Sequence, residues 1–286
     1  MFENLTDVEY FNVPRIESPI STQEMLLNAI VQGLYKIVSE DTKQKQPLFL
    51  KIKDGVIYSL ADKIVKRQKP TIILGVTGES ASGKTTLVNN TLKACLKNRN
   101  KHICTIISCD DYFKDTSKEL KEAGSFEKLF KSGMNFDIPD AYDLDIMKNH
   151  IKELSRKRKI VSPRYDFVTC ESFPDGEKKF PAKVILSEGL FALESIFEEV
   201  LDVSIYIETP EELIKERWFK RAVSRGKTPQ DAKVQFDIVK TEAMRHIIPK
   251  KDTADLVING IASAEYIEFV AGEIFDTIKK SISEVF

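Results

Sequence analysis

Gly78-Glu79-Ser80-Ala81-Ser82-Gly83-Lys84-Thr85 decides the fold of this chain, because the stretch matches G-x-x-x-x-G-K-[ST], the pattern of a phosphate-binding loop or P-loop. Glycines let consecutive backbone N–H groups of such a loop point inward, and these donors hold an anionic polyphosphate at the N-terminus of the next helix. Lys84 is expected to reach the β- and γ-phosphates, and Thr85 to offer its hydroxyl to Mg²⁺. The loop predicts a nucleoside triphosphate site.

The residues around the loop support this interpretation. Before it, Thr71-Ile72-Ile73-Leu74-Gly75-Val76 is a short apolar run typical of a buried strand. After it, Val88, Leu92, Cys95 and Leu96 follow a helical period. Strand, loop and helix in this order are the context that a P-loop requires. The alternative is a surface Gly/Ser turn beside a solvated lysine.

The chain beyond the loop alternates between strands and helices. Short, β-branched, apolar runs occur at 71–75, 103–109, 183–187, 203–207 and 255–259. This alternation predicts an α/β fold in three layers, with a mostly parallel five-stranded sheet between helices. Ligands of such sheets bind beyond the carboxyl ends of the strands, and the P-loop follows one such end.

Two segments depart from the alternation. Residues 160–182, the arm, read as two strands, Ile160 to Phe173 and Lys178 to Phe180, which predicts a β-hairpin turning at Pro174-Asp175-Gly176. Residues 1–69, the N-terminal appendage, begin with a helix capped by Ser21-Thr22-Gln23-Glu24.

The rest of the appendage predicts a hairpin around Asp54-Gly55, with Val56-Ile57-Tyr58 as its return strand, and then a short helix. We expect an α+β appendage over 1–69 and a P-loop domain over 70–286. The role of the appendage stays open: it could cover a sheet edge, form an interface in a homo-oligomer or bind a ligand.

Composition excludes several classes of protein. Hydrophobic residues make up 42% and charged residues 30%, and the formal net charge is −1, so no basic field indicates a nucleic-acid partner. No apolar run reaches about 18 residues, which argues against a membrane span. The four cysteines, Cys95, Cys104, Cys109 and Cys170, lack the spacing of metal ligands and are expected as reduced thiols. These features predict a cytoplasmic enzyme with a small-molecule substrate.

Two predicted strands end in carboxylates. Ile106-Ile107-Ser108-Cys109 runs into Asp110, and Val184-Ile185-Leu186-Ser187 runs into Glu188. Phosphoryl transfer needs a carboxylate that orients or deprotonates the acceptor and a partner for Mg²⁺. We assign Asp110 to the first role and Glu188 to the second. The alternatives are a helix cap or turn for Asp110 and a structural role for Glu188.

Several blocks in order resemble the uridine kinase family, within the wider group that includes phosphoribulokinase and pantothenate kinase. The resemblance covers residues 71–260. Its blocks are the P-loop, Ser108-Cys109-Asp110-Asp111-Tyr112-Phe113, Asn135-Phe136-Asp137-Ile138-Pro139-Asp140-Ala141-Tyr142-Asp143, Pro163-Arg164-Tyr165-Asp166-Phe167, Ser187-Glu188-Gly189, the lid residues Arg217, Arg225-Gly226-Lys227 and Gln235, and Lys250-Lys251-Asp252-Thr253-Ala254-Asp255.

The resemblance implies a role for each matching residue. Asp110 would accept the proton of a ribose 5′-hydroxyl, with Lys84 and Arg217 as further catalytic residues. The residues implied to bind ATP are Gly78, Ser80, Ala81, Ser82, Gly83, Lys84, Thr85, Thr86, Arg225 and Lys227. The residues implied to bind the acceptor are Asp137, Phe113, Tyr165, Phe167, Cys170, Lys220 and Gln235. Thr85, Glu188 and Asp110 would hold Mg²⁺.

Within this assignment, Asp137 would bind the ribose 2′- and 3′-hydroxyls, and Tyr165 and Phe167 would flank the base. Without the resemblance, Asp137 reads as part of a turn, the two aromatic residues as hairpin packing, and the lid cations as a solvated helix face.

Four positions depart from the family pattern on the acceptor side. Cys170 replaces a histidine that contacts the pyrimidine, Ser172 an arginine, Phe113 a tyrosine and Ile138 a histidine. Sites that read a substrate through hydrogen bonds discriminate strongly, whereas apolar pockets do not. The sequence thus keeps the parts needed for phosphoryl transfer and changes those that recognise the base.

Three functions follow as hypotheses. The first is phosphorylation of uridine or cytidine by ATP, giving the 5′-monophosphate and ADP. The second is a kinase of the same group acting on another hydroxyl compound, such as a sugar phosphate, pantothenate or a different nucleoside. The third is a nucleotide-binding regulatory protein with the appendage as its interaction module. The sequence does not choose between ATP and GTP as donor.

Overall fold

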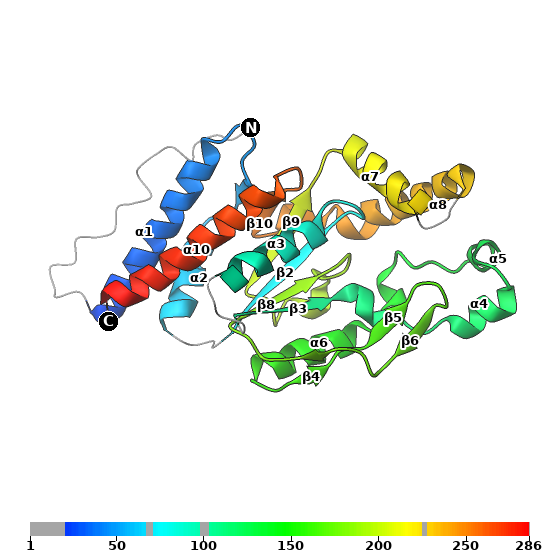
Figure 1. Cartoon of the computed structure of the whole chain (residues 1–286), viewed down its shortest axis with the longest axis horizontal. Coiled ribbons are helices and arrows are strands. Elements are labelled where there is room, and N and C mark those ends of the chain that lie inside the picture. Colours follow the sequence, from blue (N-terminus) through cyan, green and yellow to red (C-terminus); the bar gives the residue numbers. More distant parts are fainter. Residues whose placement is uncertain (1–20, 67–70, 98–102, 225–227, 286) are drawn as a thin grey trace.

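One sheet forms the centre of the fold (Figure 1). The structure is a computed structural model that describes residues 21–66, 71–97, 103–224 and 228–285. The sheet has six strands in the order β1-β10-β9-β2-β8-β3. They span β1 (Phe49–Ile52), β2 (Ile72–Gly78), β3 (Cys104–Ser108), β8 (Val184–Glu188), β9 (Val203–Glu208) and β10 (Leu256–Asn259). β1 pairs antiparallel with β10, and all other pairs are parallel. The five strands predicted from sequence are confirmed as the parallel part, and the appendage adds the sixth.

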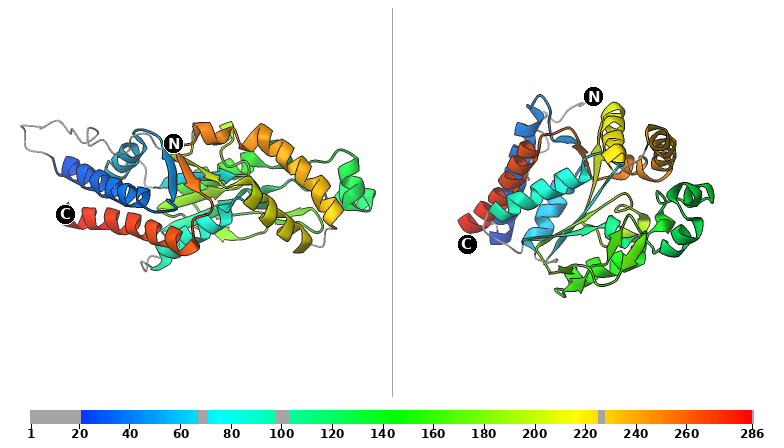
Figure 2. Two further views of the ribbon diagram at one scale, coloured as in Figure 1. Left: turned by 90° about the horizontal axis from the view of Figure 1, so that it is seen from above. Right: turned by 45° about the vertical axis from the view of Figure 1, so that its right-hand side comes forward.

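Helices cover both faces of the sheet and make three layers (Figures 1 and 2). Neighbouring strand residues point to opposite faces, so Ile185 and Tyr206 enter one apolar core while Leu186 and Ile207 enter the other. The second core is shared by α1 (Thr22–Thr42), α2 (Val56–Val65), α3 (Lys84–Lys97) and α10 (Ala264–Val285).

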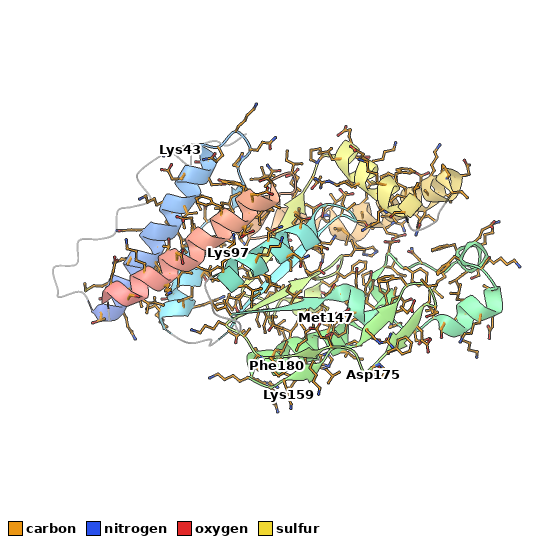
Figure 3. The ribbon with its side chains drawn as sticks, in the orientation of Figure 1. Lys43, Lys97, Met147, Lys159, Asp175 and Phe180 are labelled. Carbon is orange, nitrogen blue, oxygen red and sulfur yellow. The ribbon has the colours of Figure 1, made fainter. Side chains whose placement is uncertain are left out.

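The first core lies under α6 (Leu144–Ser155). Met147 of α6, labelled in Figure 3, is fully buried. Its sulfur atom lies 3.6 Å from that of Cys109. The shorter elements are α4 (Ser117–Ala123), α5 (Phe126–Lys131), α9 (Lys250–Thr253), a π-helical turn (Ala243–Ile247) and 3₁₀ turns at Cys109–Tyr112, Pro139–Ala141 and Ser195–Phe197. Among the described residues, no helix combines the length and apolarity that crossing a membrane requires.

The hairpin predicted for the appendage is wrong. Residues 56–65 form α2, and β1 pairs with β10 rather than with a return strand. Gly55 adopts a left-handed φ of 76° at the start of α2, so the turn leads into a helix. Ile57, Ala61 and Val65 are all buried at helical spacing, so burial of this apolar face overrides the strand propensity of Val56-Ile57-Tyr58.

The arm is also more divided than the sequence predicts. β4 (Ile160–Val161) pairs with β7 (Lys178–Lys179), as expected, but β5 (Arg164–Asp166) pairs with β6 (Glu171–Phe173). The single long strand expected for 160–173 therefore folds back at 167–170, where Cys170 takes a left-handed φ of 54°. This extra turn brings the tip of the arm over the pocket described below.

The expected lid is helical and consists of α7 (Glu211–Ser224) and α8 (Pro229–Glu242). The two helices enclose an apolar cluster of their own around Trp218 and Phe236. The lid is thus an internally packed unit at the carboxyl end of the sheet (Figure 1).

A buried carboxylate joins the appendage to the rest of the chain. Asp41, near the end of α1, is 1% exposed and accepts hydrogen bonds from the backbone N–H groups of Leu48 (2.8 Å) and Phe49 (2.9 Å) and from the hydroxyl of Tyr266 on α10 (2.7 Å). α1, β1 and α10 therefore meet at one side chain. The boundary between residues 69 and 70 stays a prediction.

We expect Asp41→Ala to lower the free energy of unfolding by about 3 kcal/mol, because it leaves three donors without their acceptor in a buried site. Urea titration followed by circular dichroism measures the change. Glu40→Ala is the matched control, since Glu40 is an exposed neighbour paired with Lys43, and we expect it to change stability by less than about 0.5 kcal/mol. Equal effects of the two substitutions would contradict the role of Asp41.

Candidate active site

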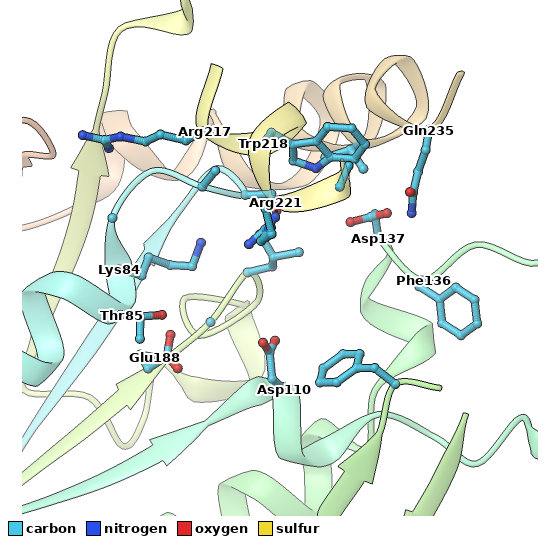
Figure 4. Close-up of a pocket in the computed structure, with 18 of the residues that line it drawn as sticks. Lys84, Thr85, Asp110, Phe136, Asp137, Glu188, Arg217, Trp218, Arg221 and Gln235 are labelled. Carbon is cyan, nitrogen blue, oxygen red and sulfur yellow. The ribbon is translucent and has the colours of Figure 1, made fainter. Parts of the chain in front are cut away.

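A cavity of about 1490 Å³ lies at the carboxyl ends of β2, β3 and β8. The P-loop forms one wall, the lid another, and the arm together with residues 126–142 closes the acceptor side (Figure 4). The predicted site residues that line it are Ser80, Ala81, Gly83, Lys84, Thr85, Thr86, Asp110, Phe113, Asp137, Tyr165, Phe167, Cys170, Glu188, Arg217 and Gln235. The structure thus brings the donor and acceptor residues into one space.

The P-loop has the shape that its glycines predict. Gly78 has φ of 155°, and a Cβ there would lie 2.7 Å from the Ser82 hydroxyl and 2.8 Å from the Ile207 carbonyl oxygen. Only glycine fits this position. Gly78 and Ser82 do not line the cavity; Gly78 shapes the loop, and Ser82 is fully buried beneath it.

Lys84 opens α3 and bends back over the loop. Its ammonium group donates to the carbonyl oxygens of Gly78 (2.8 Å) and Glu79 (3.0 Å). Burial lowers the pKa of Lys84, while the nearby carboxylates of Glu188 and Asp110 oppose that shift. A half-buried cation at a helix N-terminus, open to the cavity, is suited to a polyphosphate.

The oxygen donors suited to Mg²⁺ lie beside Lys84. Figure 4 shows Thr85 next to Glu188, with Asp110 facing them. Glu188 accepts a hydrogen bond from the Ser108 hydroxyl (2.6 Å), and burial raises its pKa against the effect of that bond and of Lys84. Among the described residues no group of three or more His, Cys, Asp or Glu side chains forms a metal site. Mg²⁺ is commonly held by one or two carboxylates together with substrate phosphates, so this donor set fits it.

Asp137 occupies the acceptor side, below Gln235 in Figure 4. Its backbone N–H donates to the Asn135 side chain (2.9 Å), so the expected turn is present and presents the carboxylate to the cavity. Burial raises the pKa of Asp137 to about 6, and the positive charge of Arg221 opposes the shift. A perturbed carboxylate in a cleft marks a candidate binding residue.

Aromatic rings build the wall between Asp110 and Asp137. The ring of Phe113 lies 4.0 Å from that of Tyr142, 4.9 Å from Tyr165, 5.7 Å from Phe167 and 6.1 Å from Phe136, centroid to centroid. This arrangement offers flat apolar surfaces on which a ring can stack.

The four departures from the family pattern do not share one location. Phe113 and Cys170 line the cavity, whereas Ser172 and Ile138 do not. The backbone N–H of Ser172 instead donates to Asp115 (2.9 Å). Only the changes at 113 and 170 therefore bear directly on the acceptor pocket.

The lid cations only partly follow the prediction. Arg217 lines the cavity and donates to the Gly260 carbonyl oxygen (3.2 Å). Lys220 does not line it: its side chain is 74% exposed and pairs with Glu216 (2.5 Å). Arg225 and Lys227 fall outside the described residues.

Sequence reasoning missed Arg221. This residue lines the cavity, and its guanidinium donates to the Ser80 hydroxyl of the P-loop (2.5 Å). Its spacing of four from Arg217 was the available signal, since residues i and i+4 share one face of a helix. Arg221, not Lys220, is the second cation that α7 gives to the cavity.

Comparison with known proteins matches residues 73–265 to the Phosphoribulokinase / Uridine kinase family. A uridine kinase from Clostridium tetani is 30% identical over 217 residues, which cover 74% of this chain and 99% of that protein. A uridine kinase from Borrelia turicatae is 32% identical over 189 residues, covering 65% of this chain and 85% of that protein. Phosphoribulokinase from Rhodobacter spheroides is 15% identical, with a TM-score of 0.47 over 67% of this chain and 71% of that one. The family match begins in β2, so it leaves out the appendage.

The raised pKa of Asp137 predicts a pH-dependent stability. Because its folded-state pKa lies above its unfolded value, the folded protein holds this proton more tightly, and stability falls as pH rises from about 4 through about 6. Above that window the ionised carboxylate is a destabilising group. We expect Asp137→Asn to raise the free energy of unfolding at pH 7.5 by on the order of 1 kcal/mol, after discounting for partial exposure. Thermal unfolding at pH 7.5 and pH 4 tests this: the advantage should vanish at pH 4, and a constant difference would contradict it.

Proposed function

The chain belongs to the Phosphoribulokinase / Uridine kinase family, and from this premise we propose that it transfers the γ-phosphoryl group of ATP to the 5′-hydroxyl of uridine or cytidine. It is a phosphotransferase with a hydroxyl acceptor, as its family and its uridine kinase relatives establish. The finer proposal is carried by one observation: Lys84, Asp110 and Asp137 face a single cavity.

The donor end of the cavity has the groups that a triphosphate needs. P-loop N–H groups, Lys84, Arg217 and Arg221 supply positive charge for the phosphates. Thr85 and Glu188 would hold Mg²⁺, which when bound neutralises charge on the β- and γ-phosphates. We assign ATP as donor on the strength of the P-loop.

Asp110 is the proposed base. It follows β3 directly, and Figure 4 places its carboxylate between Glu188 and the aromatic wall. A hydroxyl held there would give its proton to Asp110 as its oxygen attacks the γ-phosphorus, while the bond to the β,γ-bridging oxygen breaks and ADP leaves. The lid closes the cavity above this point and would exclude water from the transfer.

The acceptor end suits a ribonucleoside. Ionised Asp137 accepts two hydrogen bonds, which matches the paired 2′- and 3′-hydroxyls of ribose. Tyr165 and Phe167 offer stacking faces for the base on the arm. Gln235, whose side-chain oxygen is buried without a hydrogen-bond partner within the described chain, adds one polar group toward the ligand.

One observation favours the second candidate, a kinase of the same group with another hydroxyl substrate. On the acceptor side of the cavity, Phe113 supplies a ring face and Cys170 supplies a thiol. Both stand in place of groups that form stronger hydrogen bonds. Such a wall binds flat or apolar groups with little discrimination between polar edges. A cytoplasmic location and a homo-oligomer both stay predictions.

Replacement of Asp110, the proposed general base, tests the catalytic assignment. We expect Asp110→Asn to lower kcat by about 10²- to 10⁴-fold, because the proton of the acceptor loses its recipient. The dissociation constant for MgATP should change by less than about threefold. Coupled ADP-release kinetics with uridine and a nucleotide titration measure the two quantities. Asp111→Asn is the matched control: this neighbouring carboxylate does not line the cavity, and its replacement should leave kcat within about threefold.

A panel of acceptors tests the substrate. We expect uridine and cytidine to be phosphorylated with kcat/KM values within about tenfold of each other, because stacking does not distinguish their polar edges. The panel should include adenosine, pantothenate and a sugar phosphate, with product identified by mass. Turnover of one of these three without any turnover of a pyrimidine nucleoside would exclude the first candidate and support the second.

A further inference from the structure

The P-loop of this chain carries a negative charge at its second position. Glu79 follows Gly78, and its side chain is only 12% exposed. It does not line the cavity, and its carboxylate contacts the lid helix α8 instead. A carboxylate fixed beside a site for a polyanion opposes binding unless a cation compensates it.

That cation is Lys240, near the end of α8. Its ammonium group lies 2.8 Å from the Glu79 carboxylate and 3.4 Å from that of the exposed Glu211. The Lys240 side chain is 20% exposed, so solvent screens this ion pair less than a surface pair. Burial lowers the pKa of Lys240, but the hydrogen bonds and negative charges of Glu79 and Glu211 together outweigh burial, so the pKa is raised.

The backbone of Glu79 holds the phosphate-binding lysine. Its carbonyl oxygen accepts hydrogen bonds from the Lys84 ammonium group (3.0 Å) and from the Ser82 N–H (3.0 Å). A shift of residue 79 therefore displaces both a loop donor and Lys84. The next residue, Ser80, is held from the lid as well, by Arg221.

We propose that Lys240 is a positioning residue for the nucleotide: by neutralising and fixing Glu79, it lets a P-loop with an internal carboxylate bind MgATP. Lys240 acts through Glu79 and has no contact with the cavity. The inference rests on the proposed function for the identity of the nucleotide. It adds that the loop and the lid form one charge-balanced unit.

The test is a charge cycle on the full chain, read as the dissociation constant for MgATP by calorimetry. We expect Lys240→Met to raise this constant about tenfold, since it leaves the largely buried Glu79 carboxylate unpaired beside the phosphates. Glu79→Gln and the double variant Glu79→Gln/Lys240→Met should each stay within about threefold of wild type, because neither carries the unpaired charge. Lys240→Arg should keep wild-type affinity.

Two controls isolate the pair. Glu211→Gln removes the other partner of Lys240, and Lys233→Met removes an exposed lysine from the same helix; both should leave the constant unchanged. In steady-state kinetics Lys240→Met should raise KM for ATP with a smaller change in kcat, a split that general destabilisation does not produce.

Each outcome either supports or overturns the role proposed for Lys240. Wild-type affinity in Lys240→Met, or a double variant as weak as Lys240→Met, would overturn the inference alone. If Lys240→Met does not fold, the double variant carries the test: it must fold and bind MgATP like the wild type, and its failure counts against the inference. Wild-type protein that binds no MgATP would overturn the proposed function and this inference together.

Discussion

The parallel register of β2, β8 and β3 is the constraint on which the site depends. Ser108 pairs with Glu188, and Glu188 with Val76 two residues before the P-loop begins. Parallel strands end at the same edge of a sheet. This register therefore places the P-loop, Glu188 and Asp110 side by side at the carboxyl edge of the sheet. Because both faces of these strands are buried in the core, the groups proposed for catalysis are attached to packed strands rather than to free loops.

The sequence predicted those parts of the molecule that local pattern determines. Five apolar runs predicted the parallel strands. The position of Asp110 and Glu188 at strand ends predicted that both would line one cavity. The pattern failed where tertiary burial decides between two local choices. Residues 56–58 have strand propensity, yet their helical face packs into the core. Lys220 and Arg221 are adjacent in sequence, and the packing of α7 against α8 turns Arg221 toward the cavity, on the same helix face as Arg217. The fold of the arm tip at Cys170 needs a left-handed residue that is not glycine, and no sequence rule indicated it.

The donor end of the site is electrostatically unfavourable by itself, as a site for a charged ligand should be. Burial pushes Lys84 and Glu188 toward their neutral forms. A triphosphate with Mg²⁺ brings both signs of charge and would complete what each group lacks. A loss of stability at these positions is what the proposed polyanion site would cause on partly buried charged residues. Asp137 is a further carboxylate whose pKa burial raises, and the proposed contact with two hydroxyls would account for a carboxylate at this position.

The two ends of the cavity are therefore under different constraints. At the donor end, spacing and charge are both fixed, because phosphates demand donors at set positions on the loop and the strand ends. At the acceptor end, Asp137 would fix only where a pair of hydroxyls can lie under the proposed function, and the ring faces around Phe113 offer only a plane for stacking. A wall of this kind selects for shape before it selects for polar edges. Under the proposed function, Phe113 and Cys170 on the aromatic wall are therefore the altered positions that bear on substrate choice, while the sheet positions the groups proposed for the chemistry.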